Sequence, residues 1–556
     1  MKTFTSGLIA RIWLALILPV LTGYSAIAQG FSPHATARLQ FIIDSFQNNP
    51  ANPYIGGLSV AIDVDGLASW NGATGYAARN VDGQNNLLPG GTPFTTTTLS
   101  RMYSVTKTFT SALVLELAKK GAFSLEDPVS RFLPLNLINP ELNENVTIRQ
   151  LLAHESGYSN YTDELQLQIA VAFQPTHVWT PFEMLSFVHQ VNAPGTERRY
   201  SSTNYITLGA IIEAATGIPV EQHFRKKFFG PLHLNSMFFG EREPLWNGAI
   251  LASPHDNLSP FNPIFQLTGQ PTFPNAYTNV SAFPFTGIVS LAFTGGAIVT
   301  DAKDMARWGN ALFGARATSY STLHTMINSI SQVPDDDGDF LGYGIFRTTR
   351  ISATDIFIGH DGRAPGYRSV MFYQPDKKMT IAILTNYYGA NLYDVAKALY
   401  ESLPGFTCGN KNRKEDKIVV CFKGHDLCVD RKAAAVHINK GAWLGGCEKP
   451  AVCPVYKSKM EPMERLSGNA GIKIFPNPAS SRATLSFSSP KSGQVSAALY
   501  DITGKYVLSI FKGYAEKGIS QQVEINMANL PEGIYIVRLQ VQQMIKQERL
   551  VVIKKL

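Results

Sequence analysis

The order of hydrophobic and polar residues predicts a domain of mixed strands and helices over most of the chain. Residues 56–66 (GGLSVAIDVDG) alternate in the manner of a strand. Residues 369–386 (SVMFYQPDKKMTIAILTN) predict a hairpin with its turn at Pro375–Asp376. Apolar residues at helical spacing predict helices over residues 105–117, 148–154, 204–217 and 393–403. Gly121 can end the first of these helices, and Thr147 suits the N-cap of the second.

Length and pattern together divide the chain into several parts. At 556 residues the chain is too long for one hydrophobic core. We predict an α/β (α+β) domain at residues 31–403, a cysteine-bearing segment at residues 407–454 and a polar linker at residues 455–470. Short alternating strands punctuated by Gly and Pro then predict a small all-β sandwich at residues 471–556.

The N-terminus has the pattern of a cleaved signal peptide, which we place at residues 1–28. Lys2 and Arg11 precede the ten-residue apolar run Ile12–Leu21. The small residues Ala26–Ala28 then supply the cleavage positions. A membrane anchor is the alternative, but a bilayer needs about 20 apolar residues. No later stretch is long and apolar enough, so we expect no transmembrane segment.

Basic residues are concentrated toward the C-terminus. Residues 407–556 carry 23 Lys and Arg against 12 Asp and Glu, whereas residues 1–406 carry 26 against 30. A nucleic-acid surface needs basic residues clustered on an element that can enter a groove. The sequence offers no such cluster, and an exported chain has little access to nucleic acid. We therefore expect no nucleic-acid partner.

Ser104 and Lys107 stand three residues apart at the start of a predicted helix, in RMYSVTKTFT. A serine hydroxyl is a weak nucleophile until a base takes its proton. Side chains one helical turn apart share a face, and burial lowers the pKa of an ammonium group so that a neutral amine is present. The pair therefore suits acyl transfer, although two such common residues are specific only with partners elsewhere in the chain.

Two further motifs follow in order along the chain. PGTERRYSSTNY contains Tyr200, Ser201 and Ser202, and FIGHDGRAPGYRS contains His360–Gly362. Together with SVTK they resemble the three motifs of the serine β-lactamase and penicillin-binding-protein superfamily, in particular its class C branch, over about residues 36–402. The resemblance implies a β-lactamase/transpeptidase-like domain, with an antiparallel sheet flanked by helices and an all-helical lobe.

The resemblance also implies a role for each motif residue. Ser104 is the nucleophile, and Lys107 is its immediate proton acceptor. Tyr200 passes the proton to the leaving group and then activates water. The oxyanion hole consists of the backbone N–H groups of Ser104 and Arg363, and one such donor is worth about 2.7–4 kcal/mol. This chemistry requires neither a cofactor nor a metal.

Two positions depart from the family pattern, and both concern substrate binding. Ser202 stands where the family usually has asparagine, and a hydroxyl is shorter than an amide and donates or accepts less well. His360 stands where many β-lactamases have lysine. Histidine can contact a substrate carboxylate when protonated, or hydrogen-bond toward Tyr200 when neutral. We expect Ser202, His360 and Gly362 to contact the substrate.

These features predict a secreted or surface serine hydrolase that cleaves a small-molecule or peptide ester or amide through an acyl-enzyme. An esterase, a D-amino-acid peptidase or a D-alanyl-D-alanine carboxypeptidase-like enzyme fits this description. The alternatives are a β-lactamase, which Ser202 and His360 disfavour, and a non-catalytic relative that binds peptidoglycan or β-lactams. The loops at residues 158–178 and 241–284 are expected to select the acyl and leaving groups.

All five cysteines lie between Cys408 and Cys453. Because the chain is expected to be exported, these cysteines are expected to form disulfides. The alternative is that they bind zinc together with nearby histidines. If four of the five cysteines pair, one stays unpaired. The segment also resembles a short Cys/His segment of secreted Bacteroidetes-type proteins. Two other metal-like patterns are weaker. His154 fits a helix end better than a zinc site, and residues 334–339 (PDDDGD) lack the spacing of a calcium loop.

From Ile472 the sequence resembles a type IX secretion C-terminal sorting domain, on IFPNPASSRATLSF, LYDITGKYV, LPEGIYIVRL and ERLVVIKKL. The resemblance implies a β-sandwich that an outer-membrane export machine reads. The chain is then exported through the periplasm of a Gram-negative, Bacteroidetes-like bacterium and becomes secreted or surface-bound. An ordinary adhesive or carbohydrate-binding sandwich is the alternative.

Overall fold

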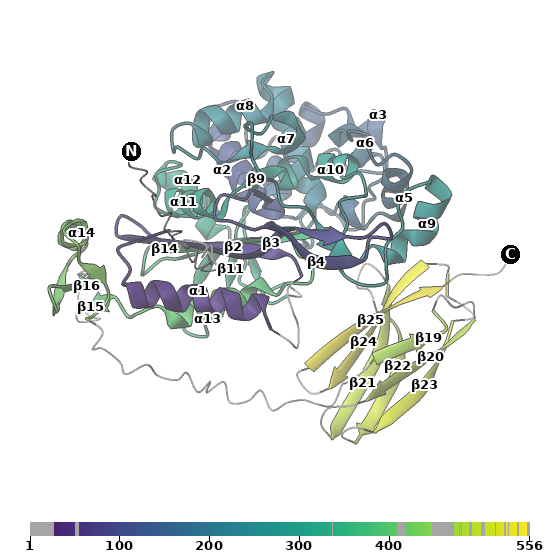
Figure 1. Ribbon diagram of the computed structural model, residues 1–556. Helices are drawn as coiled ribbons and strands as arrows, with labels where there is room; N and C mark the ends of the chain where they lie inside the picture. Colours follow the sequence, from purple (N-terminus) through teal and green to yellow (C-terminus); the bar gives the residue numbers. More distant parts are fainter. Residues whose placement is uncertain are drawn as a thin grey trace, which may run out of the picture. The chain divides into compact units, whose positions relative to one another are not determined.

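A computed structural model describes two compact units, residues 1–447 and residues 448–556 (Figure 1). In the first unit the described residues are 27–49, 55–335, 337–408 and 417–447. In the second they are residues 472–552, with gaps at 478, 480, 489–491, 502–505, 517–518, 528–529, 532 and 542–543. The predicted signal peptide (apart from Ile27 and Ala28), the predicted linker and Cys453 lie outside these ranges.

A nine-stranded antiparallel sheet forms the centre of the first unit, in the order β1-β3-β2-β14-β13-β12-β11-β10, with β4 paired to β3. Its strands are β1 Ile27–Gln29, β2 Gly57–Val64, β3 Ala68–Val81, β4 Leu87–Pro93, β10 Phe340–Leu341, β11 Phe346–Thr348, β12 Phe357–Ala364, β13 Tyr367–Gln374 and β14 Met379–Thr385. Smaller pairings involve β5 Ser100–Arg101, β6 Phe238–Phe239, β7 His255–Asp256, β8 Thr278–Asn279 and β9 Ile298–Thr300.

Helices cover both faces of this sheet. Figure 1 shows α1 (Pro33–Gln47) and α13 (Leu392–Ser402) on one face and the helices that lie between them in the sequence on the other. These others are α2 Thr106–Lys119, α3 Leu135–Ile138, α4 Ile148–Leu152, α5 Leu165–Phe173, α6 Pro181–Leu185, α7 Ser202–Thr216, α8 Val220–Phe224, α9 Asn262–Thr268, α10 Thr286–Gly296, α11 Ala302–Phe313 and α12 Tyr320–Asn328. The predicted antiparallel sheet with flanking helices is confirmed.

Strand β14 shows why the hairpin could be recognised in the sequence. It pairs with β13 on one side and β2 on the other, and all seven of its residues are buried. Ile381 and Ile383 pack toward α1 and α13, whereas Ala382 and Leu384 pack into the core on the other face. A strand covered on both faces reads as a continuous apolar run, and MTIAILT is such a run.

The helices that carry the site begin and end where local signals place them. Thr147 and Gln150 form a capping box at the start of α4. Gly217 ends α7 in the left-handed conformation that favours glycine (φ 65°). The segment before α2 is a 3₁₀ turn, Tyr103–Val105, so Ser104 lies in a tight turn just ahead of the helix.

The described part of the cysteine-bearing segment belongs to the first unit and packs against its core. It comprises β15 Thr407–Cys408, β16 Lys417–Phe422, β17 His425–Asp430, α14 Arg431–Asn439 and β18 Trp443–Leu444. Disulfides join Cys408 to Cys428 and Cys421 to Cys447, which confirms the disulfide prediction. Ile418, with other apolar residues of the segment, joins the core beneath α1, so the segment extends that core.

The second unit is the predicted β-sandwich. One sheet has the order β19-β20-β23 and the other β22-β21-β24-β25. The strands are β19 Ile472–Phe475, β20 Arg482–Ser488, β21 Gly493–Asp501, β22 Tyr506–Ala515, β23 Ser520–Asn526, β24 Gly533–Val541 and β25 Met544–Val552. Alternate residues of β20 are buried, as expected for a strand with one face on the core. Across the described residues, no helix is long and apolar enough to cross a bilayer.

The central position of β14 predicts a large stability cost for truncating it. Ile383→Ala removes a fully buried side chain and should lower the free energy of unfolding by about 2–5 kcal/mol, measured by denaturant titration. Ile356→Ala is the matched control, because Ile356 is 45% exposed, and it should change stability by less than about 0.5 kcal/mol. Equal losses in the two variants would contradict the two-layer packing.

Candidate active site

The site begins at the 3₁₀ turn that carries Ser104. Ser104 is half-buried, and its neighbour Tyr103 has a φ of 42°, in the left-handed region that a bulky side chain rarely adopts. Such strain persists only where surrounding contacts hold the backbone in place. The turn directs the Ser104 hydroxyl toward Lys107, whose Nζ lies 2.9 Å from Ser104 Oγ.

Lys107 is fully buried, and its amine has three oxygen neighbours. Nζ lies 2.9 Å from Ser104 Oγ, 3.3 Å from Ser202 Oγ and 2.7 Å from the carbonyl oxygen of Gly295. Burial lowers the pKa of Lys107 to about 7, against a weaker opposing effect of the Asp361 carboxylate. A neutral amine donates two hydrogens, here to Gly295 and Ser202, which leaves its lone pair for the Ser104 proton.

Tyr200 approaches the same hydroxyl from a different element. It ends the loop before α7, and its phenol donates a hydrogen bond to Ser104 Oγ at 2.8 Å. Burial raises the pKa of Tyr200 well above its ordinary value, although hydrogen bonding to Ser104 opposes this. Tyr200 is therefore protonated and can donate a proton, whereas Lys107 is the group able to accept one.

His154 supports Tyr200 and was missed as a site residue. Its imidazole is buried and stacks on the Tyr200 ring with centroids 4.7 Å apart. Its Nδ1 accepts the backbone N–H of Ser201 at 3.1 Å, rather than facing helix carbonyls as the sequence suggested. Burial, reinforced by the positive charge of Lys107, lowers the pKa of His154 well below its ordinary value, so the ring is neutral.

The third motif lies on β12, and its glycine is required by close packing. A Cβ at Gly362 would lie 2.2 Å from the carbonyl oxygen of Met102, two residues before Ser104. Only glycine lets β12 approach the turn that carries Ser104 so closely. Arg363 follows on the same strand and lines the same pocket as Ser104. This arrangement brings the two expected oxyanion-hole residues to one site.

The geometry does not support the predicted contact between His360 and the substrate. The imidazole is fully buried and packs on Phe346, with ring centroids 4.0 Å apart. Burial lowers the pKa of His360 to about 3, so the ring carries no charge for a carboxylate. Among the described residues, nothing hydrogen-bonds its Nε2. The sequence placed His360 just before a strand, whereas it lies within β12. A local motif cannot distinguish a histidine that packs in the core from one that binds the substrate.

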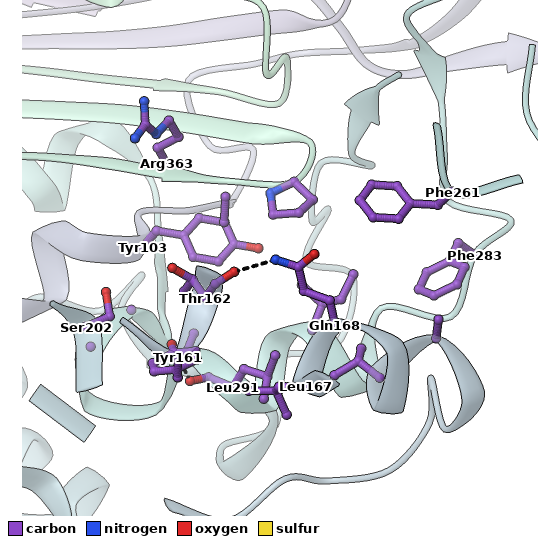
Figure 2. A pocket seen from close by; sticks show the side chains of 18 of the residues that line it. Tyr103, Tyr161, Thr162, Leu167, Gln168, Ser202, Phe261, Phe283, Leu291 and Arg363 are labelled. Atoms are coloured by element: carbon purple, nitrogen blue, oxygen red, sulfur yellow. Dashed lines mark hydrogen bonds between the residues drawn. The ribbon is translucent and has the colours of Figure 1, made fainter. Parts of the chain in front are cut away.

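A pocket of about 260 Å³ opens beside Ser104 (Figure 2). Ser202 and Arg363 lie at its polar end, and most of the remaining lining is aromatic or aliphatic. The lining draws on residues 161–172 and 258–283, which fall within the two loops expected to select the substrate. Gly295 and Gly296 also line it. The glycine pair in the apolar run FTGGAIVT was the signal that could have singled out this segment.

Comparisons with protein families agree with this geometry. The Beta-lactamase family model matches residues 43–403, more than half of the chain. The model of the secretion system C-terminal sorting domain matches residues 473–554. The second match assigns the chain to type IX secretion, and therefore to the cell surface or the medium of a Bacteroidetes-like bacterium.

Curated relatives match only part of their own length. "Protein flp" of Staphylococcus aureus strain N315 is 30% identical over 187 residues, which is 34% of this chain and 35% of that protein. A "putative D-alanyl-D-alanine carboxypeptidase" of Salmonella heidelberg is 26% identical over 239 residues, 42% of this chain and 53% of that protein. The chain thus spans about a third to a half of the length of these relatives.

Solved structures share the fold. A D-stereospecific amidohydrolase from Streptomyces sp. has a TM-score of 0.53 and 23% identity, over 66% of this chain and 98% of that one. The D-amino acid amidase from Ochrobactrum anthropi SV3, complexed with L-phenylalanine amide, has a TM-score of 0.53 and 22% identity over the same shares. At this identity the likeness establishes the fold and leaves the substrate open.

The lowered pKa of Lys107 predicts how reactivity depends on pH. With Lys107 expected to act as the base in its neutral form, the rate of Ser104 labelling by a fluorophosphonate should rise about tenfold per pH unit below pH 7 and level off above it. Initial labelling rates between pH 5 and 9 measure this, with circular dichroism to verify folding. Lys107→Arg keeps a positive charge without a base and should remove the rise. A flat wild-type profile would contradict the assignment.

Proposed function

We propose that this chain, which belongs to the β-lactamase family, is an exported serine hydrolase that cleaves an ester or amide through an acyl-enzyme on Ser104. One observation carries the proposal: the same hydroxyl oxygen lies 2.9 Å from a buried amine and 2.8 Å from a protonated phenol. A base and an acid on one nucleophile are what acyl transfer requires.

Acylation proceeds in this proposal with Lys107 as base and Tyr200 as acid. Lys107 takes the Ser104 proton while Oγ bonds to the carbonyl carbon of the substrate. Tyr200 then protonates the leaving oxygen or nitrogen as its bond to that carbon breaks. Backbone N–H groups of Ser104 and Arg363 stabilise the negative charge on the carbonyl oxygen. The step leaves an ammonium on Lys107 and a phenolate on Tyr200.

Deacylation reverses these proton movements. The Tyr200 phenolate takes a proton from water as the water oxygen bonds to the acyl carbon. The bond to Ser104 Oγ breaks, and Oγ recovers its proton from the Lys107 ammonium. The acid is released and both groups regain their starting states, so each turnover consumes one water and needs no other reactant.

An ester or a D-amino-acid amide is the substrate class that we favour over a β-lactam. Ser202 lies 3.3 Å from the Lys107 amine, where an asparagine amide of the family would both accept from that lysine and donate to a substrate carbonyl. The hydroxyl reaches less far into the pocket. The similarity to a putative D-alanyl-D-alanine carboxypeptidase, a D-stereospecific amidohydrolase and a D-amino acid amidase also supports amide substrates.

Labelling by a fluorescent fluorophosphonate tests the nucleophile. Wild type should become covalently labelled, and Ser104→Ala should lose labelling by at least about a thousandfold, because the variant lacks the hydroxyl that lies beside the buried amine. Ser45→Ala, at an exposed serine of α1, is the matched control and should label like wild type. Absence of wild-type labelling would favour a non-catalytic binding protein. A panel of p-nitrophenyl esters, D-alanyl peptides and nitrocefin then ranks substrates.

Ser202→Asn tests the preference against β-lactams. An amide at this position can donate to a substrate carbonyl, and one hydrogen bond of about 0.5–1.5 kcal/mol should raise the rate of acylation by a fluorescent penicillin about 3–10-fold. Gel fluorescence over time measures that rate. Ser45→Asn serves as control. An unchanged rate in Ser202→Asn would refute the role given to this hydroxyl.

A further inference from the structure

The pocket beside Ser104 is large enough to hold part of a substrate. Its volume is about 260 Å³, and an apolar cavity of about 150 Å³ already holds a benzene ring. Arg363 supplies the only charge among the described residues that line the pocket, and it is exposed. A neutral, apolar group of the size of an aryl ring with a short linker therefore fits this space.

Aromatic side chains from the loop around α9 give the pocket a fixed shape. Phe265 stacks on Phe283 with centroids 4.9 Å apart, and Phe261 stacks on Phe265 at 6.0 Å. Phe265 and Phe283 belong to a small core that also includes Ala172 from α5. Figure 2 shows Phe261 and Phe283 on one side of the pocket and Leu167 on another. Apolar surface in this arrangement favours an apolar ligand, because binding removes apolar area of both from water.

The position of Tyr200 indicates whether the acyl group or the leaving group of the substrate occupies the pocket. Tyr200 donates to Ser104 Oγ, yet among the described residues it is not part of the pocket lining, whereas Ser104 and Ser202 are. The leaving group must meet the proton donor, so it departs on the side of Tyr200. The half that remains bonded to Ser104 is the acyl group, and the pocket lies on its side.

One polar group faces this apolar space without a partner. The Tyr103 hydroxyl is buried, and within the described residues it makes no hydrogen bond. Figure 2 shows it directed into the pocket toward Gln168, whose amide donates to the Thr162 carbonyl oxygen at 2.8 Å. A buried hydroxyl without a partner is costly, so a polar atom of the ligand that reaches Tyr103 would be bound selectively.

We infer that the pocket binds the acyl group of the substrate, and that this group is a neutral aryl or branched alkyl group bearing one hydrogen-bonding atom for Tyr103. This inference rests on the proposed function and specifies its substrate class. In the acylation step the carbonyl carbon of this group bonds to Ser104 Oγ and the leaving group departs with the Tyr200 proton, as described above.

A series of p-nitrophenyl esters with one leaving group tests the acyl preference. We expect kcat/KM for the phenylacetate ester to exceed kcat/KM for the acetate ester at least tenfold. For the charged hemisuccinate ester, kcat/KM should be lower than for the acetate ester. Phe261→Ala should lower the phenylacetate-to-acetate ratio about fivefold. Phe173→Ala, at an exposed phenylalanine of α5, is the matched control and should leave the ratio unchanged.

The outcomes separate the two proposals. The acyl-pocket inference would be overturned if the enzyme hydrolysed acetate with no preference for phenylacetate, or if the phenylacetate-to-acetate ratio of kcat/KM were equal in Phe261→Ala and wild type. Either result would leave the proposed hydrolase function intact. Absence of both fluorophosphonate labelling and ester hydrolysis would overturn the proposed function itself. A preference for hemisuccinate would show that Arg363 selects an anionic acyl group instead.

Tyr103→Phe tests the hydrogen bond while keeping the ring. Among the 2-, 3- and 4-hydroxyphenylacetate esters, at least one should be hydrolysed about fivefold faster than phenylacetate by wild type. That advantage should disappear in Tyr103→Phe, whereas the phenylacetate-to-acetate ratio should stay. The hydrogen-bonding part of the inference is wrong if wild type hydrolyses no hydroxyphenylacetate ester faster than phenylacetate. It is also wrong if Tyr103→Phe keeps the faster hydrolysis of such an ester.

Discussion

The removal of the Lys107 ammonium from water is the constraint on which the site depends. Bringing its pKa from an ordinary value of 10.5 to about 7 means that the ammonium, relative to the neutral amine, is less stable here than in water by on the order of 5 kcal/mol. The helix α2 alone could not supply this, because an isolated helix leaves one side in solvent. The fold supplies it by enclosing the amine between α2, the start of α7 and the end of α10, with Gly295 accepting one of its hydrogens.

Two glycines allow close packing around the 3₁₀ turn Tyr103–Val105, which carries Ser104. Gly362 lets β12 pass within contact distance of the Met102 carbonyl, and Gly296 lies where a Cβ would meet the Tyr103 backbone at 3.4 Å. The strained φ of Tyr103 is held between these two elements. The same packing buries His360 next to Tyr200, with ring centroids 6.0 Å apart. This residue of the third motif therefore packs against Tyr200.

The groups around Ser104 and the aromatic lining of the pocket belong to two different cores of the fold. The hydroxyl, amine and phenol lie on or next to helices α2 and α7, whose packing in the main core is extensive. The aromatic part of the apolar lining, Phe261, Phe265 and Phe283, comes from the loop around α9, which belongs to a small core of its own, and α5 and α10 supply aliphatic residues. Because the two cores share few residues, the acyl preference could change without disturbing the geometry at Ser104.

The sequence by itself determined the elements: the hairpin at β13 and β14, the helix carrying Ser104 and Lys107, and the C-terminal sandwich. Each depends on local periodicity, caps or motifs, which neighbouring residues specify. Only the tertiary structure decided that Gly295 receives the lysine hydrogen, that His154 stacks on Tyr200, and that His360 is buried. These contacts join residues tens to hundreds of positions apart, and side-chain packing, which no local pattern encodes, brings them together.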